Sequence, residues 1–221
     1  MNRADSLYKY TRLAFVNSTL NNGIFASSIN SLNDPYESNS VANADKYKVV
    51  CLSRSRNKKL MWSHYADGHR GCSIKIAPPT DYGKPSCPLR RVKYSGTLVE
   101  RSGLNPCDLA NSLYIKDKKW DYELEVRAVY SEENRNLSCW KKYRNNVFLK
   151  ANITQIDFGC FSHYDACYLD ALIAIRDYNA NHKKQIKVRK YKMSNEKYEF
   201  KIDKSFDYIK EIAGIISEGE L

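Results

Sequence analysis

The sequence predicts a single α+β domain over residues 1–221, built on a mixed or mostly antiparallel sheet with helices packed against it. Short segments with apolar residues at every second position, such as Cys72–Ile76, are typical of strands with one buried face. Segments with apolar residues three and four apart, such as Phe206–Ile216, are typical of amphipathic helices. At this length roughly 70% of the unfolded chain's surface can be buried, so the predicted fold needs no disulfide support.

The composition favours an acidic partner. The chain has 36 Lys and Arg against 25 Asp and Glu, a formal net charge of +11, and 17 tyrosines. This mixture suits nucleic acid, a nucleotide or another polyanion, although a solvated basic surface has the same composition. We therefore expect an acidic macromolecule as partner, with nucleic acid as one candidate, and the oligomeric state stays open.

The cysteines and the hydropathy pattern indicate the compartment. Seven cysteines form no CxxC pair and follow no secretory leader, so we expect a reduced cytoplasmic protein without a disulfide framework. No apolar run approaches the roughly 20 residues of a membrane helix, so no membrane partner is expected. The spacing of Cys160, His163 and Cys167 is typical of metal ligands but lacks a fourth ligand, so no metal is predicted.

The chain begins with a predicted strand at Leu7–Tyr10. Thr11 is a plausible N-cap for the helix that follows, whose apolar positions are Leu13, Val16 and Leu20. Gly23 would end this helix, and Ile24–Ala26 would form the next strand.

A rigid turn is expected at Asn33–Glu37. Asn and Asp side chains hydrogen-bond to their own backbone, and proline fixes φ. The turn would present the carboxylates of Asp34 and Glu37, so Asn33, Asp34 and Glu37 are site candidates. A turn of this composition is also common without any function.

Leu60–Ile76 is the densest group of motifs. A helix from Leu60 would end near Gly68, and Cys72–Ile76 would follow as a strand. The helix and turn carry the candidates Trp62, His64, Tyr65 and His69. A histidine beside a helix end is more often structural, and this applies to His69 especially. Before the helix, a strand is predicted at Tyr47–Leu52. Ser53 follows at its end, where a hydroxyl is well placed to contact a ligand.

In the segment Lys118–Tyr130, charged and apolar residues alternate, and this pattern predicts a strand. Glu123, Glu125 and Arg127 would then share one face. This pattern fits a plain amphipathic edge strand. It also fits a pair of carboxylates positioned by an arginine, in which mutual repulsion raises one pKa.

The remaining segments predict a helix capped by Asp108, a strand at Ile153–Phe158, a helix from Asp165, a basic β-hairpin and a final helix. Six of the ten residues of Lys183–Lys192 are basic, and none is acidic. The hairpin would follow a phosphate backbone or guard a sheet edge against aggregation.

Six motifs in a fixed order resemble the bacterial family named domain of unknown function 2971. They are Leu7-Tyr8-Lys9-Tyr10, Asn33-Asp34-Pro35-Tyr36-Glu37, Cys51-Leu52-Ser53, Leu60–Ala66 with His69 and Gly71, Trp120–Arg127, and Ile156-Asp157-Phe158-Gly159. The resemblance spans nearly the whole chain. It implies that the motifs at Asn33, Trp62 and Glu123 converge on one site.

A more distant resemblance is to ADP-ribosyltransferases of the arginine-serine-glutamate class. Lys9 or Arg12, Ser53 with Ser55, and Glu123-Leu124-Glu125 follow the order of that class. The resemblance implies NAD as co-substrate, with Glu125 stabilising an oxocarbenium-like ribose and Glu123 orienting the acceptor. The full set of expected residues is Glu125, Glu123 and His64 for catalysis, and Tyr8, Lys9, Ser53, Trp62, Tyr65 and Arg127 for NAD binding.

The expected function is therefore NAD-dependent ADP-ribosyl transfer to a macromolecule, as in a toxin or defence effector. One alternative is a metal-dependent nuclease or phosphodiesterase, in which the acidic candidates hold a divalent ion and His64 or His69 acts as acid or base. Another is a binding module that stacks a nucleotide on Trp62 and Tyr65 without turnover.

Overall fold

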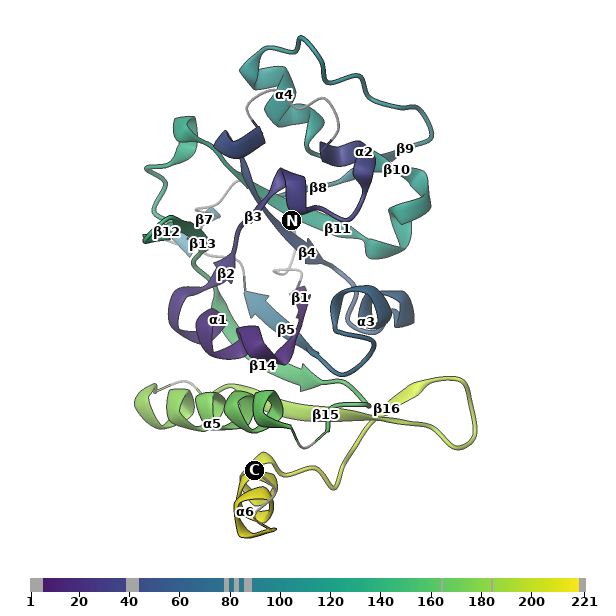
Figure 1. Cartoon of the computed structure of the whole chain (residues 1–221), viewed down its shortest axis with the longest axis vertical. Helices are drawn as coiled ribbons and strands as arrows, with labels where there is room; N and C mark the ends of the chain where they lie inside the picture. The colour runs from purple at the N-terminus through teal and green to yellow at the C-terminus, as the bar shows by residue number, and fades with distance from the viewer. Residues whose placement is uncertain are drawn as a thin grey trace. The chain divides into compact units, whose positions relative to one another are not determined.

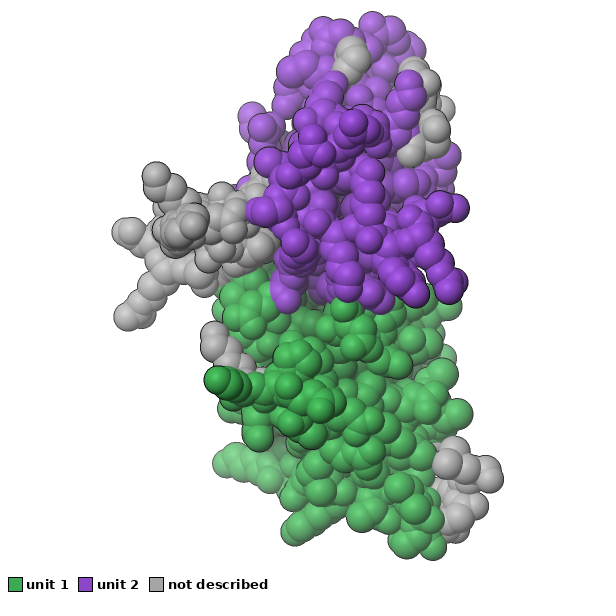
Figure 2. All heavy atoms as spheres, turned by 90° about the vertical axis from the view of Figure 1, so that its left-hand side faces the viewer, with its two compact units in different colours: residues 1–21, 56–77, 152–221 green, residues 22–55, 78–151 purple. Residues whose placement is uncertain are grey.

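The computed structural model describes residues 6–38, 44–77, 80–81, 84–85, 89–163, 165–183 and 185–218. The described chain combines helices with mixed, mostly antiparallel sheet, which confirms the α+β fold class. It divides into two compact units, shown in different colours in Figure 2. Unit 1 comprises Met1–Asn21, Arg56–Ala77 and Asn152–Leu221, and unit 2 comprises Asn22–Ser55 and Pro78–Ala151.

The sheet of unit 1 has the strand order β16-β15-β14-β5-β1. Its strands are β1 (Leu7–Thr11), β5 (Cys72–Ala77), β14 (Asn152–Phe158), β15 (Lys187–Met193) and β16 (Phe200–Ile202). β14 and β15 are parallel, and the other neighbours are antiparallel. A parallel step needs a crossover, and α5 (Ala166–Asn181) supplies it.

The other helices of unit 1 are α1 (Val16–Asn22), α3 (Lys59–Tyr65) and α6 (Tyr208–Glu218). The helix expected from Asp165 is confirmed as α5, and Asp165 is its N-cap, since its side chain accepts the Tyr168 backbone N–H at 2.8 Å. α6 lies next to α5 (Figure 1), and the Tyr168 hydroxyl donates to Glu211 Oε1 at 2.8 Å. The most deeply buried side chains of unit 1 include Trp62, Ile74, Ile156, Phe158, Tyr168 and Leu172.

The main sheet of unit 2 has the antiparallel order β4-β11-β8, with β3 paired to β4. These strands are β3 (Ser27–Ser28), β4 (Lys48–Ser53), β8 (Leu89–Arg91) and β11 (Glu125–Tyr130). The smaller sheets pair β12 (Trp140–Tyr143) with β13 (Asn146–Leu149) and β2 (Ile24–Phe25), β9 (Lys93–Ser95) with β10 (Ile115–Asp117), and β6 (Thr80–Asp81) with β7 (Lys84–Pro85).

Unit 2 has two short α-helices, α2 (Pro35–Ser38) and α4 (Pro106–Ser112), among its described residues. Its 3-10 turns include Ile29–Ser31, Ala44–Lys46, Lys118–Glu123 and Glu132–Asn134. A buried apolar cluster formed by Ile29, Tyr47, Val49, Leu109, Leu113, Tyr114 and Val129 joins α4 to the main sheet. The elements that carry the site are therefore anchored to a packed core.

Most predicted elements are confirmed, but two predicted helix caps are wrong. Arg12, not Thr11, precedes the 3-10 turn at Leu13–Phe15, and its side chain makes no capping bond. Asn105, not Asp108, caps α4, because its side chain accepts the Asp108 N–H while Pro106 takes the first turn. Within the described residues, no helix combines the length and the apolar character that a bilayer crossing needs. In the predicted basic hairpin, Lys184 lies outside the described residues.

The predicted strand over Lys118–Tyr130 is confirmed only from Glu125 onward. Before it, the Asp117 carboxylate accepts the Lys119 N–H at 3.0 Å and starts the 3-10 turn Lys118–Glu123. Leu124 then takes a left-handed conformation with φ 47°, which redirects the chain into β11. Glu123 therefore does not share the strand face with Glu125 and Arg127, because local side-chain capping overrides the alternating pattern.

Candidate functional site

Unit 2 gathers charged residues into a buried ion cluster, formed by Glu37, Lys116, Glu123, Glu125 and Arg127. Each of them is at most 5% exposed. Charged side chains are almost never this deeply buried unless they are paired. The cluster includes four of the predicted site residues and adds Lys116.

β11 positions Glu125 and Arg127, which lie two residues apart and so point to the same face. Arg127 Nε lies 2.7 Å from Glu125 Oε1, and Arg127 Nη2 lies 2.9 Å from Glu125 Oε2. This is the bidentate fork geometry of a strong arginine–carboxylate pair. β11 runs between β4 and β8 and is buried along its length, so the interpretation as a solvated amphipathic edge is wrong.

Lys116, on β10, connects the three carboxylates. Its Nζ lies 2.8 Å from Glu123 Oε2, 3.4 Å from Glu37 Oε2 and 3.6 Å from Glu125 Oε2. Arg127 Nη2 also forms an ion pair with Glu37 Oε1. Two cations are thus shared among three carboxylates. Within the described part of the chain, neither Glu37 oxygen has a hydrogen bond of regular geometry, so charge attraction holds this carboxylate.

Ser53 holds the backbone beside the cluster rather than facing a ligand. Its hydroxyl donates to the Glu123 carbonyl at 2.6 Å and accepts the Ser55 N–H at 2.9 Å. The side chain is buried, and the neighbouring Arg54 N–H donates to the Leu124 carbonyl at 3.2 Å. The end of β4 therefore fixes the turn that carries Glu123.

Glu125 and Lys116 stay charged at neutral pH. Burial by itself would raise the pKa of Glu125, but the charge and hydrogen bonds of Arg127, together with Lys116, lower it to about 2. Burial likewise opposes the charge on Lys116, but the three glutamates outweigh it and raise the Lys116 pKa. Glu125 is therefore ionised at neutral pH and does not act as a general acid, so it is not the member of the pair whose pKa repulsion would raise.

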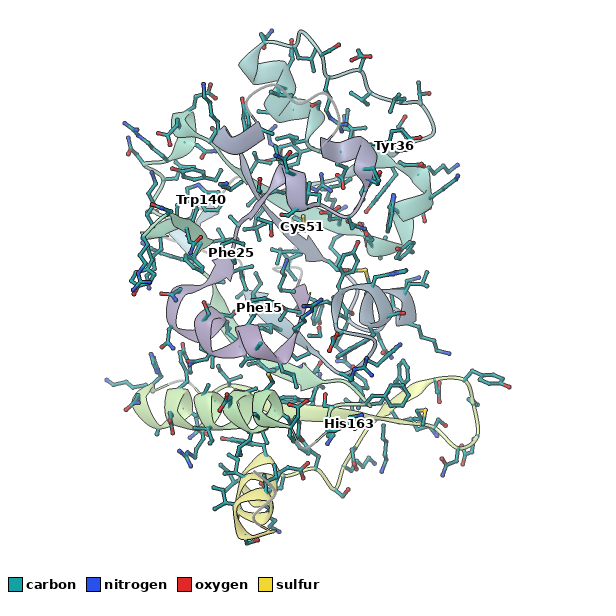
Figure 3. All side chains as sticks on the ribbon, viewed as in Figure 1. Phe15, Phe25, Tyr36, Cys51, Trp140 and His163 are labelled. Carbon is teal, nitrogen blue, oxygen red and sulfur yellow. The ribbon has the colours of Figure 1, made fainter. Side chains whose placement is uncertain are left out.

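A pocket of about 290 Å³ adjoins the cluster. Asp34, Glu37, Arg101 and Lys116 lie among its lining residues, together with Tyr36, the segment Ser95–Val99, Ile115, Asp117 and Lys119. Figure 3 labels Tyr36 on α2 and Cys51 on β4, two of the elements that build this site. Glu123 and Glu125 do not line the pocket, but both pair with Lys116, which does.

Apart from the two Glu37 oxygens, which have ion-pair partners, two polar groups of the pocket residues are buried without a hydrogen-bond partner among the described residues. Asp34 Oδ1 accepts the Tyr36 N–H at 3.0 Å, whereas Asp34 Oδ2 has no partner. Arg101 donates from Nη1 to the Tyr36 carbonyl and from Nη2 to the carbonyls of Ser112 and Ile115, whereas its Nε has no partner. A buried acceptor and a buried donor that lack partners cost about 1–3 kcal/mol each, so a ligand that satisfies both would be stabilised.

Four of the predicted NAD-binding residues lie in unit 1, and one of them, Trp62, is a buried tryptophan. Trp62 is 1% exposed, and its ring packs edge-on against Tyr10 at 5.3 Å and Tyr191 at 5.4 Å between centroids. Tyr8 and Lys9 lie on β1, and Tyr65 lies at the end of α3. Trp62 is thus a core side chain in unit 1 and offers no free face for stacking.

The two histidines occupy different surroundings in unit 1. His64 is exposed on α3, whereas the ring of His69 lies 4.9 Å from Phe200 and 6.0 Å from Phe161 between centroids. Burial, followed by the charge of Lys59, lowers the His69 pKa. A Cβ on Gly159 would lie 2.0 Å from the His69 carbonyl oxygen, so only glycine allows this close backbone contact. The position of His69 therefore fits a structural role.

Sequence reasoning missed Lys116 and Arg101. Lys116 lies on a strand of three residues, too short to show periodicity, and Arg101 lies outside regular structure. Among the turn residues, Asn33 is exposed and does not line the pocket. Nothing in the local sequence distinguishes Lys116 and Arg101 from the other 34 basic residues of the chain.

Within the described residues, no three His, Cys, Asp or Glu side chains are grouped so as to hold a metal ion. Comparison of the chain with family models, with curated proteins and with solved structures gives no match. The two resemblances drawn from the sequence motifs therefore stay predictions, and the functional argument rests on the geometry of unit 2.

Proposed function

We propose that the pocket of unit 2 binds the nicotinamide riboside end of NAD and that the protein transfers the ADP-ribosyl group to a macromolecular acceptor. The observation that carries this proposal is the pair of unpartnered buried groups, Asp34 Oδ2 and Arg101 Nε. A carboxamide and a ribose diol each offer a donor and an acceptor. The donor of such a group matches the acceptor Asp34 Oδ2, and its acceptor matches the donor Arg101 Nε.

The size of the pocket supports the same ligand fragment. Its volume of about 290 Å³ lies near the lower end of the roughly 300–1,000 Å³ typical of small-molecule sites. This space suits a pyridine ring with a sugar rather than a whole dinucleotide. The diphosphate would then lie towards the exposed Lys119 at the rim.

The chemistry uses the buried carboxylates. The bond between the ribose and nicotinamide breaks, and its electron pair leaves with nicotinamide. The ribose carbon develops oxocarbenium character, then bonds to the acceptor nucleophile, which loses its proton to solvent. Glu37, which lines the pocket, would stabilise the developing positive charge, and a fixed charge acts strongly in a site that excludes water.

Glu125 takes a different role from the one expected from the sequence. It does not line the pocket, and it binds Arg127 by two hydrogen bonds while Arg127 also pairs with Glu37. We therefore assign Glu125 as a positioning residue, which holds Arg127 and through it the Glu37 carboxylate. Glu123 acts in the same way through Lys116.

The experiment that tests this proposal is nicotinamide release from NAD by the full chain, with mixed cell extract as acceptor source. Asp34→Asn keeps the shape and the Tyr36 contact but removes the carboxylate, so release should fall at least tenfold. Asp121→Asn changes an exposed aspartate of the same unit and should leave release unchanged. No release from the wild-type protein, with or without extract, would overturn the proposal.

One observation favours a second candidate, a binding module without turnover. Lys116 and Arg127 already compensate the glutamates of the cluster, so the site can hold a polar ligand without reacting. Saturable binding of nicotinamide riboside, lost in Asp34→Asn, without release of nicotinamide from NAD would establish this alternative. A divalent ion of a nuclease would have to displace the same two cations.

A further inference from the structure

A second concave surface lies in unit 1, at the β15–β16 hairpin. Its pocket of about 510 Å³ is lined by Arg56, Asn57, Tyr191, Lys192, Phe200, Lys201, Ile202 and Lys204. Four of these residues are basic, and none is acidic. We call this surface the hairpin groove, and no part of the proposed transferase chemistry uses it.

The register of the hairpin places two like charges against each other. β15 and β16 are antiparallel, and Lys192 lies directly opposite Lys201. Like charges at directly opposite positions of neighbouring strands destabilise a sheet. A bound anion would reduce the repulsion between these two lysines and so stabilise the hairpin. Asp203 pairs with Lys192 at 3.0 Å and Glu196 with Lys201 at 3.2 Å, but both pairs are at the surface and are therefore weak.

Two other cations of the groove have no acidic partner within 4 Å among the described residues. The Arg56 Nε–H donates to the Tyr191 hydroxyl at 3.1 Å, which fixes the guanidinium at the groove. Lys204 is exposed at the end of β16. A chain of phosphates would therefore meet two uncompensated cations and two partly compensated ones.

Aromatic rings accompany these charges. Phe200 is half-buried in the groove, and Tyr198, in the loop between the two strands, is 99% exposed. Lys59 Nζ lies 5.9 Å from the centre of each of these two rings. A fully exposed tyrosine beside lysines is poorly explained by protection of a sheet edge, which lysine alone achieves. Base stacking on exposed rings next to a basic groove is the usual mode of single-strand binding.

We propose that the hairpin groove binds single-stranded nucleic acid, with phosphates on Arg56, Lys192, Lys201 and Lys204 and a base stacked on Tyr198. Binding itself does not depend on NAD. The inference rests on the proposed function only for the role of the bound strand, which would then be the acceptor of the ADP-ribosyl group.

The test is fluorescence anisotropy of a labelled 20-nucleotide oligo-dT with the full chain, without NAD, across a series of salt concentrations. Tyr198→Ala should weaken binding about fivefold or more, since one stacked base is worth at least about 1 kcal/mol. Because Tyr198 is fully exposed, this change leaves the core intact. Lys192→Gln with Lys201→Gln should lower the slope of log affinity against log salt by about 1.4, since each phosphate contact on a single strand contributes about 0.7.

Lys142→Gln with Lys150→Gln is the matched control, because it removes the same charge from exposed positions of unit 2. Equal weakening by the two double variants would overturn the inference, since net charge alone would then explain binding. Equal affinity for poly-glutamate, or no binding of oligo-dT, would also overturn it. The Asp34→Asn variant should bind oligo-dT normally, so failure of the transferase proposal and failure of this inference are distinguishable.

Discussion

Two arginine–carboxylate pairs of nearly identical geometry lie in the two units. In unit 2, the Arg127 guanidinium donates two hydrogen bonds to the Glu125 carboxylate, from Nε at 2.7 Å and from Nη2 at 2.9 Å. In unit 1, Arg189 on β15 donates two hydrogen bonds to the Asp157 carboxylate on β14, from Nε at 2.7 Å and from Nη2 at 2.8 Å. Both carboxylates are buried. The geometry of a pair therefore does not identify a functional site.

The surroundings of the two pairs differ. Both oxygens of Asp157 also accept hydrogen bonds from Gln155 Nε2, each at 2.9 Å, so this pair is saturated. Arg127 and Glu125 instead share charge with Glu37 and Lys116, which border a pocket with unpartnered polar groups. Spare hydrogen-bonding capacity beside a cavity, rather than a strong ion pair, therefore marks the candidate site.

Removing the arginine of each pair should give the largest difference in stability between the two pairs. Arg127→Met removes one of the two cations that three buried carboxylates share, so the free energy of unfolding should fall by about 3–5 kcal/mol. Arg189→Met leaves Asp157 with Gln155, so the loss should be about 1.5–3 kcal/mol. Urea unfolding of both variants measures this difference. Equal losses would contradict the distinction between a shared cluster and a saturated pair.

Acid should weaken unit 2 through Glu125. Its folded-state pKa is about 2 against an ordinary 4.5, so its stabilising effect is complete above pH 4.5 and is lost as the pH falls towards 2. The loss amounts to about 3 kcal/mol. Urea unfolding between pH 5 and pH 2 should show a steeper decline for the wild type than for Glu125→Gln. Parallel curves would show that Glu125 is not held ionised by the cluster.

Two matched serine variants, one in each unit, test whether the loss of a buried hydrogen bond affects activity only in unit 2. Ser53→Ala removes the hydroxyl that donates to the Glu123 carbonyl, and Ser162→Ala removes one that donates to the Arg70 carbonyl in unit 1 at 2.7 Å. Each should cost about 1–2 kcal/mol of unfolding free energy. Only Ser53→Ala should also lower nicotinamide release, because it loosens the turn that carries Glu123. Equal effects on release would argue against the position of the site in unit 2.

The smallest expected effect on stability is that of Asp34→Asn. Among the described residues the Oδ2 oxygen has no hydrogen-bond partner to lose, so the free energy of unfolding should change by less than about 1 kcal/mol. Thermal unfolding, compared with Asp121→Asn, measures this change. A loss of several kcal/mol would show that Asp34 serves the fold and not a ligand.

The sequence predicted the fold class and most elements because their periodicity is local. The strands at Leu7 and Cys72 and the helix at Asp165 are confirmed for this reason. The helix starts were less predictable, because Asn105 and Asp108 are both good caps and only the Pro106 turn decides between them.

The candidate site was only partly predictable. Glu37, Glu125 and Arg127 were expected on motifs, and the structure brings them together in unit 2. The burial of β11 depends on pairing with both β4 and β8, which alternation over one strand does not reveal. Lys116 and Arg101 join the site through tertiary contacts alone, so no local pattern could have identified them.

The most direct test of the central claim compares nicotinamide release from NAD by Glu125→Gln and Asp157→Asn, both first shown to be folded by far-UV circular dichroism. We expect Glu125→Gln to lower kcat at least tenfold with little change in KM, because Glu125 positions Glu37 without touching substrate. Asp157→Asn should retain the wild-type kcat and KM. Equal loss in both variants, or no release by the wild-type protein, would contradict the assignment of function to the buried ion cluster of unit 2.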